Sequence, residues 1–297
     1  MPKIAVIGST GMLGRDIACS HFAGYEIVEI NRGANPVSES NQHIRINSDF
    51  TDLESKIDLN EVEYVVNCAG LIRQKINEND LKSIEAAYFA NFSIPFQLVS
   101  LSEKYNFKII QIGTDCVYSG SKGGYTESDC HDAVDLYGRS KSLGEIAHKN
   151  LSVIRTSIIG KEFNASSSLL SWFLSKPYGT TVDGFIDQLW NGVTVRHFSK
   201  FVVGLIESRN FEAFSGVHHV VPADWVSKDT LLRYIASAFN REDINIIPVS
   251  SGHKRDMTLG TNDVHLNEFL WKLAGYARPL SVEEMVIEYS LAIQSGG

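Results

Sequence analysis

The chain has 297 residues, 43% of them hydrophobic and 21% charged, so it can bury a sizeable core in one large domain or two. Its formal net charge of −8 would repel a phosphate backbone, and its Lys and Arg residues form no basic cluster, which argues against nucleic acid as a partner. No apolar stretch approaches membrane-spanning length, and the four cysteines form neither a C-x-x-C pair nor a disulfide framework, so we expect a soluble, cytoplasmic protein without a membrane partner.

Short apolar runs alternate with longer amphipathic runs through the first half of the chain. This alternation is typical of βαβ units and of a parallel sheet with helices on both faces. We expect a helix over 83–105, with Pro95 as a local irregularity, and a second long helix over 136–150. The expected strands lie at 3–7, 25–30, 43–46, 64–68, 108–112 and 152–158.

The alternation of apolar and amphipathic runs becomes irregular after Gly160. Pro177, Gly179 and Gly184 interrupt the alternation, and the later elements are shorter and mixed. We therefore predict an α/β fold with a Rossmann-type, doubly wound parallel sheet over 1–160 and a smaller mixed C-terminal lobe over 161–297. A compact apolar strand at 217–221, followed by a helix at 227–239, makes the segment around 195–225 a candidate for return to the main domain.

A glycine-rich turn, Gly-Ser-Thr-Gly-Met-Leu-Gly at 8–14, follows the first strand directly and opens a helix. A G-x-x-G-x-x-G match arises by chance about 0.1 times in a chain of this length, so its position on the strand-to-helix turn carries the weight. Glycine permits the tight turn and lets the backbone approach a pyrophosphate beside the helix N-terminus. We predict dinucleotide contacts from Gly8, Thr10, Gly11, Met12, Leu13 and Gly14.

The second expected strand ends in Asn31-Arg32, where an acidic residue would bind the adenosine ribose of NAD. A guanidinium at this place suits a 2′-phosphate, so NADP is favoured over NAD. The alternative is that Arg32 is a solvated surface cation.

Tyr137 and Lys141 are spaced i, i+4 at the start of the second long helix, so they share one helix face. The same spacing at Tyr118 and Lys122 spans a Gly- and Ser-rich loop, where it confers no shared face. A phenol with a pKa of about 10 is a poor acid–base group, but a lysine about 4 Å away is worth about 4 kcal/mol at an effective dielectric near 20 and could lower it. The alternative is an amphipathic face with a snorkelling lysine.

Thr114 lies just past the fifth expected strand, at the sheet edge where doubly wound folds bind ligands. Its hydroxyl could hold a substrate oxygen beside Tyr137. The alternative is a strand-end hydroxyl that bonds the backbone. The three residues together, in this chain order after the glycine turn, favour catalysis.

Three segments of the chain are the most specific for a family: Thr-Asp-Cys-Val-Tyr-Ser-Gly at 114–120, Tyr-Thr-Glu at 125–127 and Leu-Tyr-Gly-Arg-Ser-Lys at 136–141 with Gly-Glu at 144–145. With these segments the chain resembles the extended short-chain dehydrogenases and, within them, the dTDP-4-dehydrorhamnose reductase group, over most of its length. Further support comes from Asn-Cys-Ala-Gly at 67–70, Asn91, Arg-Thr-Ser at 155–157, Asp187-Gln188, Gly192 and Thr194.

The resemblance implies an oxidoreductase that transfers hydride from NADPH to the C4 ketone of a nucleotide-linked 4-keto-6-deoxysugar, in cell-surface polysaccharide biosynthesis. It implies that Tyr137 gives the proton, Lys141 grips the nicotinamide ribose and lowers the tyrosine pKa, and Thr114 orients the ketone. Kinship suggests a homodimer, and no metal is expected. The implied further cofactor contacts are Asn31, Arg32, Asp49, Phe50, Cys68, Ala69 and Gly70, and the substrate contacts are Thr114, Asp115, Cys116, Asp187, Gln188, Trp190 and Thr194.

Three departures from the family pattern fall on the substrate side, so the sugar and the nucleotide stay open. Val193 stands in place of a proline, Asp256 follows Arg255 in place of a proline, and Cys116 replaces an aromatic residue. Two other functions stay open: a sugar-nucleotide epimerase of the same superfamily, and a non-catalytic NADP-binding subunit like that of methionine adenosyltransferase. A dehydratase would need an acid where Cys116 stands. The adjacent pair His218-His219 has no third ligand at metal spacing.

Overall fold

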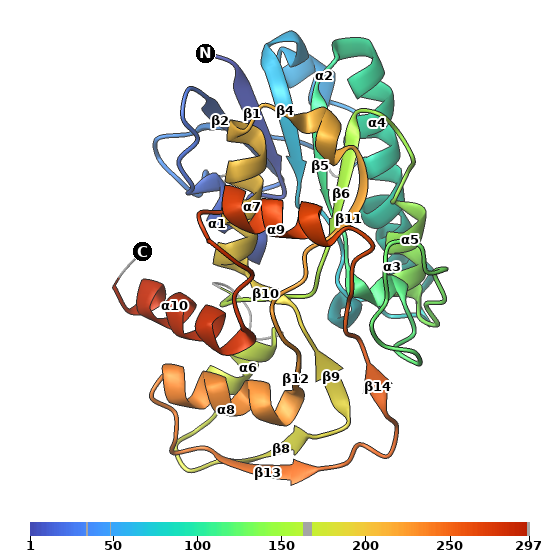
Figure 1. Cartoon of the computed structure of the whole chain (residues 1–297). Helices are drawn as coiled ribbons and strands as arrows, with labels where there is room; N and C mark the ends of the chain where they lie inside the picture. Colours follow the sequence, from blue (N-terminus) through green and yellow to red (C-terminus); the bar gives the residue numbers. More distant parts are fainter. Residues whose placement is uncertain (34, 48, 163–167, 296–297) are drawn as a thin grey trace.

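The computed structural model describes residues 1–33, 35–47, 49–162 and 168–295, and within them a seven-stranded parallel sheet forms the centre of the molecule's N-terminal half (Figure 1). The strand order is β11-β6-β5-β4-β1-β2-β3, so the direction of winding reverses between β1 and β4. This confirms the predicted doubly wound fold. The strands are β1 (Lys3–Ile7), β2 (Glu26–Asn31), β3 (Gln42–Arg45), β4 (Val62–Asn67), β5 (Lys108–Ile112), β6 (Leu151–Arg155) and β11 (Gly216–His219).

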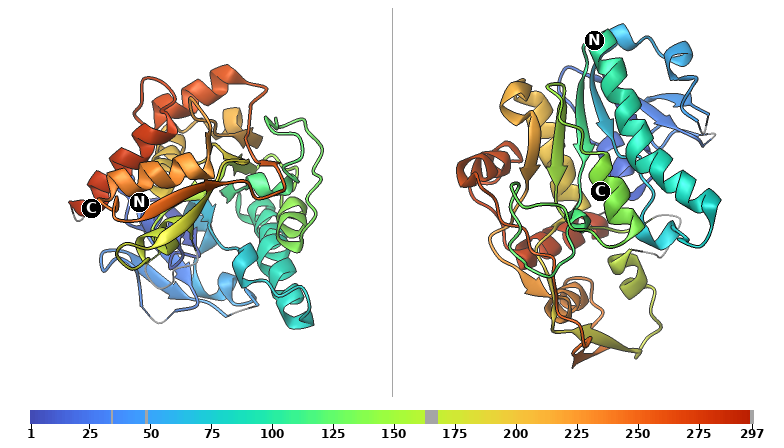
Figure 2. Two further views of the ribbon diagram at one scale, coloured as in Figure 1. Left: turned by 90° about the horizontal axis from the view of Figure 1, so that it is seen from below. Right: turned by 90° about the vertical axis from the view of Figure 1, so that its right-hand side faces the viewer.

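Alternate residues of the central strands pack on opposite faces of the sheet. Ile4 and Val6 of β1 join the core beneath α1 (Met12–Ala18) and α7 (Val195–Glu207), with α9 (Val264–Leu273) packed on α7. Ala5 and Ile7 join a second core beneath α2 (Leu53–Lys56) and α4 (Ile94–Tyr105). Figure 2 shows these helix layers on either side of the sheet. Both faces of the strands are therefore buried, which explains their continuous apolar sequences.

The predicted helix over 83–105 is broken into three parts. It consists of α3 (Leu81–Tyr88), a π-helical turn at Phe89–Ser93, and α4. Pro95 explains the break, because it has no N–H to donate and its ring would clash with the carbonyl of Asn91, four residues earlier. The expected irregularity is confirmed, and the structure places it in the turn that precedes the proline.

The second predicted helix, over 136–150, is too long. In the structure α5 spans Leu136–Leu143 and stops at Gly144. A Cβ atom at Gly144 would lie 2.1 Å from the Asn91 carbonyl oxygen, so this glycine lets the end of α5 approach the π-helical turn. The chain then leaves the helix and Glu145 turns toward β6.

The C-terminal part is built from small sheets with helices around them (Figure 1). β8 (Thr181–Phe185) pairs with β13 (Asn245–Val249), and β9 (Gln188–Trp190) lies between β12 (Val226–Ser227) and β14 (Arg255–Asp256). The short β10 (Val193–Thr194) pairs with β7 (Ile158–Ile159). The remaining helices are α6 (Leu169–Leu174), α8 (Lys228–Ala238) and α10 (Val282–Gln294).

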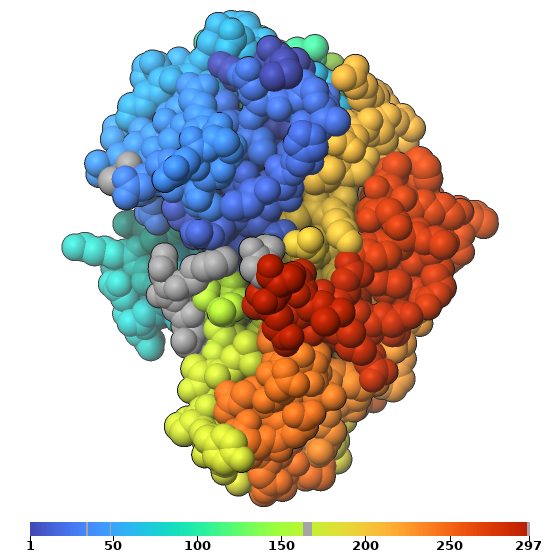
Figure 3. Space-filling model, turned by 90° about the vertical axis from the view of Figure 1, so that its left-hand side faces the viewer, coloured from blue at the N-terminus to red at the C-terminus, as the bar shows by residue number. Residues whose placement is uncertain are grey.

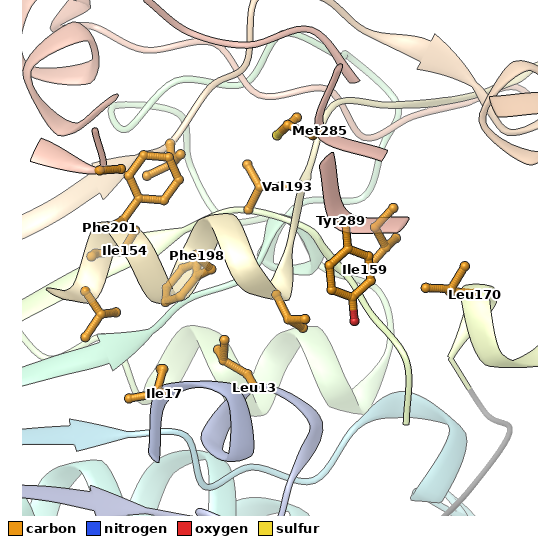
Figure 4. Packing of buried hydrophobic residues seen from close by; sticks show 14 of the residues in the cluster. Leu13, Ile17, Ile154, Ile159, Leu170, Val193, Phe198, Phe201, Met285 and Tyr289 are labelled. Carbon is orange, nitrogen blue, oxygen red and sulfur yellow. The ribbon is translucent and has the colours of Figure 1, made fainter. Parts of the chain in front are cut away.

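The segment around 195–225 lies with the large sheet, where α7 covers one face and β11 pairs in parallel with β6. The core beneath α7 continues without a break into the C-terminal part (Figure 4). There Leu13 and Phe198 belong to the same cluster as Leu170 and Met285. Figure 3 shows α10, in red, lying against residues of both parts of the chain. The two parts therefore share one hydrophobic core.

Candidate active site

The predicted functional segments meet at the carboxyl edge of the large sheet. The turn that begins at Gly8 follows β1, the segment 68–70 follows β4, and Thr114 follows β5. Because β4 lies beside both β1 and β5, the three segments are neighbours at the point where the winding reverses. Doubly wound folds bind ligands at this point.

The glycine-rich turn is tightly packed and requires glycine at two positions. Gly8 has a φ of +77°, and a Cβ atom there would lie 2.9 Å from the Ala69 backbone nitrogen. A Cβ atom at Gly14 would lie 2.2 Å from the Gly8 carbonyl oxygen. Thr10 and Gly11 are exposed at the tip of the turn, whereas Leu13 packs into the core. The backbone can thus approach a ligand closely, as a pyrophosphate site requires.

The end of β2 is fixed to this turn by Asn31. Its Nδ2 donates to Ser9 Oγ (2.8 Å) and its Oδ1 accepts from the Gly33 backbone N–H (2.8 Å). Arg32 is exposed beside it. Asn31 therefore positions the turn, and Arg32 remains the side chain that could reach a 2′-phosphate.

The predicted adenine contact, Asp49-Phe50, divides between surface and core. Asp49 is exposed, and its Oδ1 accepts a hydrogen bond from the Thr51 hydroxyl (2.9 Å). Phe50 is 4% exposed and packs in the core beneath α4. Of the two, only Asp49 presents its side chain to the surface.

The structure brings Thr114, Tyr137 and Lys141 together. The Asp135 carboxylate caps α5 by accepting from the Gly138 N–H (2.8 Å). A Cβ atom at Gly138 would lie 2.1 Å from the Cys116 carbonyl oxygen, so α5 packs directly on the turn that follows Thr114. Lys141 Nζ donates to the carbonyl of Ile112, the last residue of β5 (2.6 Å).

Thr114 has contacts that fit both of its predicted roles. Its Oγ1 accepts from the Cys116 N–H (3.2 Å) and donates to Asp115 Oδ1 (3.2 Å), so it caps a 3-10 turn at Asp115–Val117. Its side chain also acts on the Tyr137 phenol, whose pKa it lowers. A substrate oxygen near this hydroxyl would therefore lie near the phenol as well.

Burial sets the protonation state of the two ionisable groups on α5. Burial raises the pKa of the Tyr137 phenol, and it outweighs the hydrogen bond with Thr114. Burial also lowers the pKa of Lys141 to about 8, against the opposing effects of Glu145 and then Cys68. Desolvation is the largest effect on this phenol, and the lowering of its pKa by Lys141 stays a prediction. At neutral pH the phenol is protonated, as a proton donor must be.

Asp187 and Gln188, predicted to contact substrate, hold a loop in this structure. The Asp187 carboxylate accepts from Ser250 Oγ (2.6 Å) and from the Ser251 N–H (2.9 Å), and these bonds lower its pKa to about 2. Gln188 Nε2 donates to Ser251 Oγ and to the His253 carbonyl (2.9 Å each). The pair therefore joins the turn before β9 to the loop at 250–253.

Trp190 and Thr194, also predicted to contact substrate, lie in the protein interior. Trp190 is 6% exposed and faces Val226 of β12. Thr194 is 1% exposed and caps α7 through hydrogen bonds with His197. The structure gives these two side chains packing and capping roles.

Three cations that the sequence predictions omit converge on the turn at Asp115-Cys116. Arg73 and Arg255 both act on the Cys116 thiol and on Lys228, whose own pKa burial lowers. Arg73 forms an ion pair with Asp135 at the start of α5. Within the part of the chain that the structure describes, Lys228 and Arg255 form no ion pair with a carboxylate. Of the three, only Arg255 is marked in the sequence, as part of a departure from the family pattern. The three residues lie far apart along the chain, so the sequence does not group them.

Asn91 is a second group that the site predictions omit. It is 1% exposed in the π-helical turn, its Nδ2 donates to Ser140 Oγ (2.9 Å), and its Oδ1 accepts from the Leu71 N–H (2.9 Å). It thereby ties α5 to the segment after β4. The proline that follows it within a helix pattern is the sequence signal that could have marked it.

Two motifs that the sequence analysis sets aside have other contacts in the structure. Tyr118 is 1% exposed and Lys122 lies in a loop, where it pairs with Asp129. His219 contacts Arg155 and the Gly260 carbonyl. Among the described residues, no group of three or more His, Cys, Asp and Glu side chains could hold a metal ion.

None of the described helices is long and apolar enough to cross a membrane.

Comparison with known proteins places these features in a family context. The family model described as RmlD substrate binding domain matches residues 2–267. A dTDP-4-keto-6-deoxy-D-glucose reductase of Streptomyces niveus is 24% identical over 278 residues, covering 91% of this chain and 90% of that protein. A dTDP-4-dehydrorhamnose reductase of Aggregatibacter actinomycetemcomitans is 25% identical over 164 residues, covering 53% of this chain and 51% of that protein.

Two kinds of solved structure share the fold. The dTDP-4-dehydrorhamnose reductase of Bacillus anthracis in complex with NADP has a TM-score of 0.71 at 19% identity, covering 98% of this chain and 99% of that one. The UDP-glucuronic acid 4-epimerase of Bacillus cereus in complex with UDP-glucuronic acid and NAD has a TM-score of 0.74 at 17% identity, with coverage of 98% and 99%.

Proposed function

The chain belongs to the RmlD substrate binding domain family, and on this premise we propose that it reduces the C4 ketone of a nucleotide-linked 4-keto-6-deoxysugar with NADPH. The observation that carries the proposal is the meeting of Thr114, Tyr137 and Lys141 at the sheet edge, beside the glycine turn. The named reductases among the relatives support the reaction type and the substrate class.

The residues present suit a dinucleotide cofactor. The close approach of Gly8 to Ala69 and of Gly14 to Gly8 leaves a bare backbone where a diphosphate would lie. Arg32 would hold a 2′-phosphate, Asp49 the adenine, and the segment 68–70 would line the cofactor. When bound, a reduced nicotinamide supplies the hydride. The reductase neighbour that holds NADP supports this choice, while the epimerase neighbour holds NAD.

The chain's own groups would manage the proton and the charge. The Tyr137 phenol, kept protonated by burial, would donate its proton to the ketone oxygen as C4 becomes a secondary alcohol. The Lys141 ammonium, held at the last carbonyl of β5, would stabilise the phenolate that remains until solvent returns the proton. Thr114 would fix the ketone oxygen beside the phenol.

The cations at the Asp115-Cys116 turn support an anionic substrate. Arg73, Lys228 and Arg255 come from three separate segments and face this turn, so together they favour a ligand with negative charge. The diphosphate of a sugar nucleotide has such a charge. The nucleotide and the sugar configuration are left for experiment.

The test is a substrate panel. The purified protein is incubated with NADPH and with dTDP-, GDP-, UDP- and CDP-linked 4-keto-6-deoxysugars while reduced-cofactor absorbance is followed. Oxidation of NADPH in proportion to the sugar supplied is the expected result. Conversion of a sugar nucleotide with protein-bound NAD and no net oxidation would indicate an epimerase. Tight NADP binding without any conversion would indicate a non-catalytic subunit.

A further inference from the structure

A buried ion-pair cluster lies behind the active site, centred on Arg155 at the end of β6. Arg155 is 3% exposed, and its Nε donates to both carboxylate oxygens of Glu145 (2.9 and 3.0 Å). Its Nη1 donates to the Tyr118 hydroxyl (2.7 Å) and lies 3.1 Å from His219 Nε2. Its Nη2 lies 2.6 Å from His131 Nε2. The guanidinium thus has a partner on each of its nitrogens.

The partners of Arg155 belong to the two segments that carry the predicted catalytic groups. Glu145 lies four residues after Lys141, just beyond the end of α5. Tyr118 closes the 3-10 turn that Thr114 caps. A Cβ atom at Gly113 would lie 2.7 Å from Arg155 Cγ, so the residue before Thr114 rests on the arginine. One side chain therefore spans both segments.

We propose that Arg155 and Glu145 are positioning residues for the reaction. Arg155 holds the Thr114 segment and the Tyr137–Lys141 helix in one relative geometry, and it fixes Glu145, the acidic residue nearest to Lys141 along the chain, just beyond the end of that helix. The proposal rests on the proposed function, because it concerns the same three catalytic groups.

Among the groups that act on Lys141, Glu145 has the largest effect against its desolvation. Burial lowers the pKa of Lys141 to about 8, while Glu145 and then Cys68, at the end of β4, act to raise it. The Cys68 thiol is itself kept neutral, because burial raises its pKa to about 12. Glu145 is therefore the charged side chain that opposes the desolvation of Lys141 at neutral pH.

The groups that face Glu145 leave its charge in place. Burial lowers the pKa of both His131, in the loop before α5, and His219, on β11, so both rings favour the neutral form. Arg155 is thus the permanent cation against this carboxylate. A bidentate guanidinium fixes the carboxylate's orientation as well as its charge.

Glu145→Gln separates the charge from the contact, because the amide keeps the shape and one acceptor oxygen. We expect the alkaline limb of kcat, near pH 8 in the unchanged protein, to move to lower pH by roughly one unit, with roughly tenfold loss at pH 8.5 and little at pH 6. Glu29→Gln is the matched control, because Glu29 is a fully buried carboxylate bonded to the loop at 37–41. Its limb should stay in place even if its Tm falls.

Arg155→Lys separates geometry from charge. A lysine keeps the positive charge but cannot span Glu145, Tyr118 and His219 together, so kcat should fall about tenfold at every pH while the alkaline limb stays in place. If Glu145→Gln fails to fold, the double variant Glu145→Gln/Arg155→Gln leaves no unpaired buried charge and should show the same lowered limb.

A second readout needs no turnover. Selective 13C labelling of lysine, with Lys141→Arg to identify its signal, gives the pH at which Lys141 titrates in the purified protein. Glu145→Gln should lower that pH, and Glu29→Gln should not. A folded Glu145→Gln protein with unchanged Lys141 titration overturns the proposal. If the unchanged protein oxidises no NADPH with any sugar while Lys141 titrates as expected, the proposed function fails and the charge relation between Glu145 and Lys141 stands.

Discussion

The large sheet and the C-terminal part position their functional side chains in different ways. Thr114 follows Gly113, whose N–H bonds the Ile154 carbonyl of β6, and Lys141 is bonded to the last carbonyl of β5, so the backbone of a buried sheet positions both. Asp187 and Gln188 are held instead by hydrogen bonds to an exposed loop at 250–253. The difference teaches that the proposed catalytic groups are held by buried backbone, whereas the proposed substrate contacts are held by side-chain hydrogen bonds near solvent.

The largest effect in either region is expected for a substitution of Tyr137, whose helix packs beside the large sheet. Tyr137→Phe removes the proposed proton donor but keeps the aromatic ring on α5, so kcat should fall about 10³-fold. NADPH affinity, measured by fluorescence titration, should change little. A variant that kept most of its turnover with the same sugar would show that another group donates the proton.

The glycine turn tests whether backbone geometry controls cofactor binding. Gly14→Ala places a Cβ atom 2.2 Å from the Gly8 carbonyl oxygen, which should weaken NADPH binding about 10- to 100-fold through about 1–3 kcal/mol of strain. Gly260→Ala is the control, because the nearest atom to its Cβ would lie 3.4 Å away. Equal losses of affinity in the two variants would contradict the expectation.

Arg32 tests whether a side chain near solvent has a smaller effect than buried backbone within the same region, because it is exposed at the end of β2 in the large sheet. Arg32→Ala should reduce the preference for NADPH over NADH by about tenfold, since one charge-assisted contact to a 2′-phosphate is lost. The ratio of kcat/KM for the two cofactors measures this. Arg45→Ala, another exposed arginine on the neighbouring strand β3, should leave the ratio unchanged.

The smallest effect is expected at the loop contact in the C-terminal part. Asp187→Asn weakens the hydrogen bonds to Ser250 and Ser251, so KM for the sugar nucleotide should rise about threefold with NADPH affinity unchanged. Asp183→Asn, an exposed position on β8, is the control. A loss as large as that of Tyr137→Phe would erase the contrast between the two regions.

The central strands of the large sheet could be predicted from sequence because they are buried on both faces. The predicted bounds of β1 and β5 agree with the structure, and those of the other strands differ by a few residues at their ends. The short strands β7, β10, β12 and β14 could not be predicted, since two residues hold no periodic pattern. Their pairing depends on contacts between distant parts of the chain.

The predictions for the site divide by sequence distance. Tyr137 and Lys141 were found because one helical turn separates them. Arg73, Lys228 and Arg255 were not recognised as a group, because only the fold brings their segments to one turn. The effect of burial on the Tyr137 phenol also escaped the sequence, because periodicity reveals a neighbouring charge but not how much water is excluded.

The π-helical turn at Phe89–Ser93 sets the rotation of α3 relative to α4 about the helix axis. A π-helical turn holds one residue more than an α-helical turn. This extra residue rotates α3 by about 100° about the helix axis relative to α4. This rotation decides which side of α3 meets α5, and it lets the Asn91 carbonyl approach Gly144. A single-residue deletion within this turn would rotate α3 by about 100° about the helix axis relative to α4 and would turn a different face of α3 toward α5, the helix that carries Tyr137.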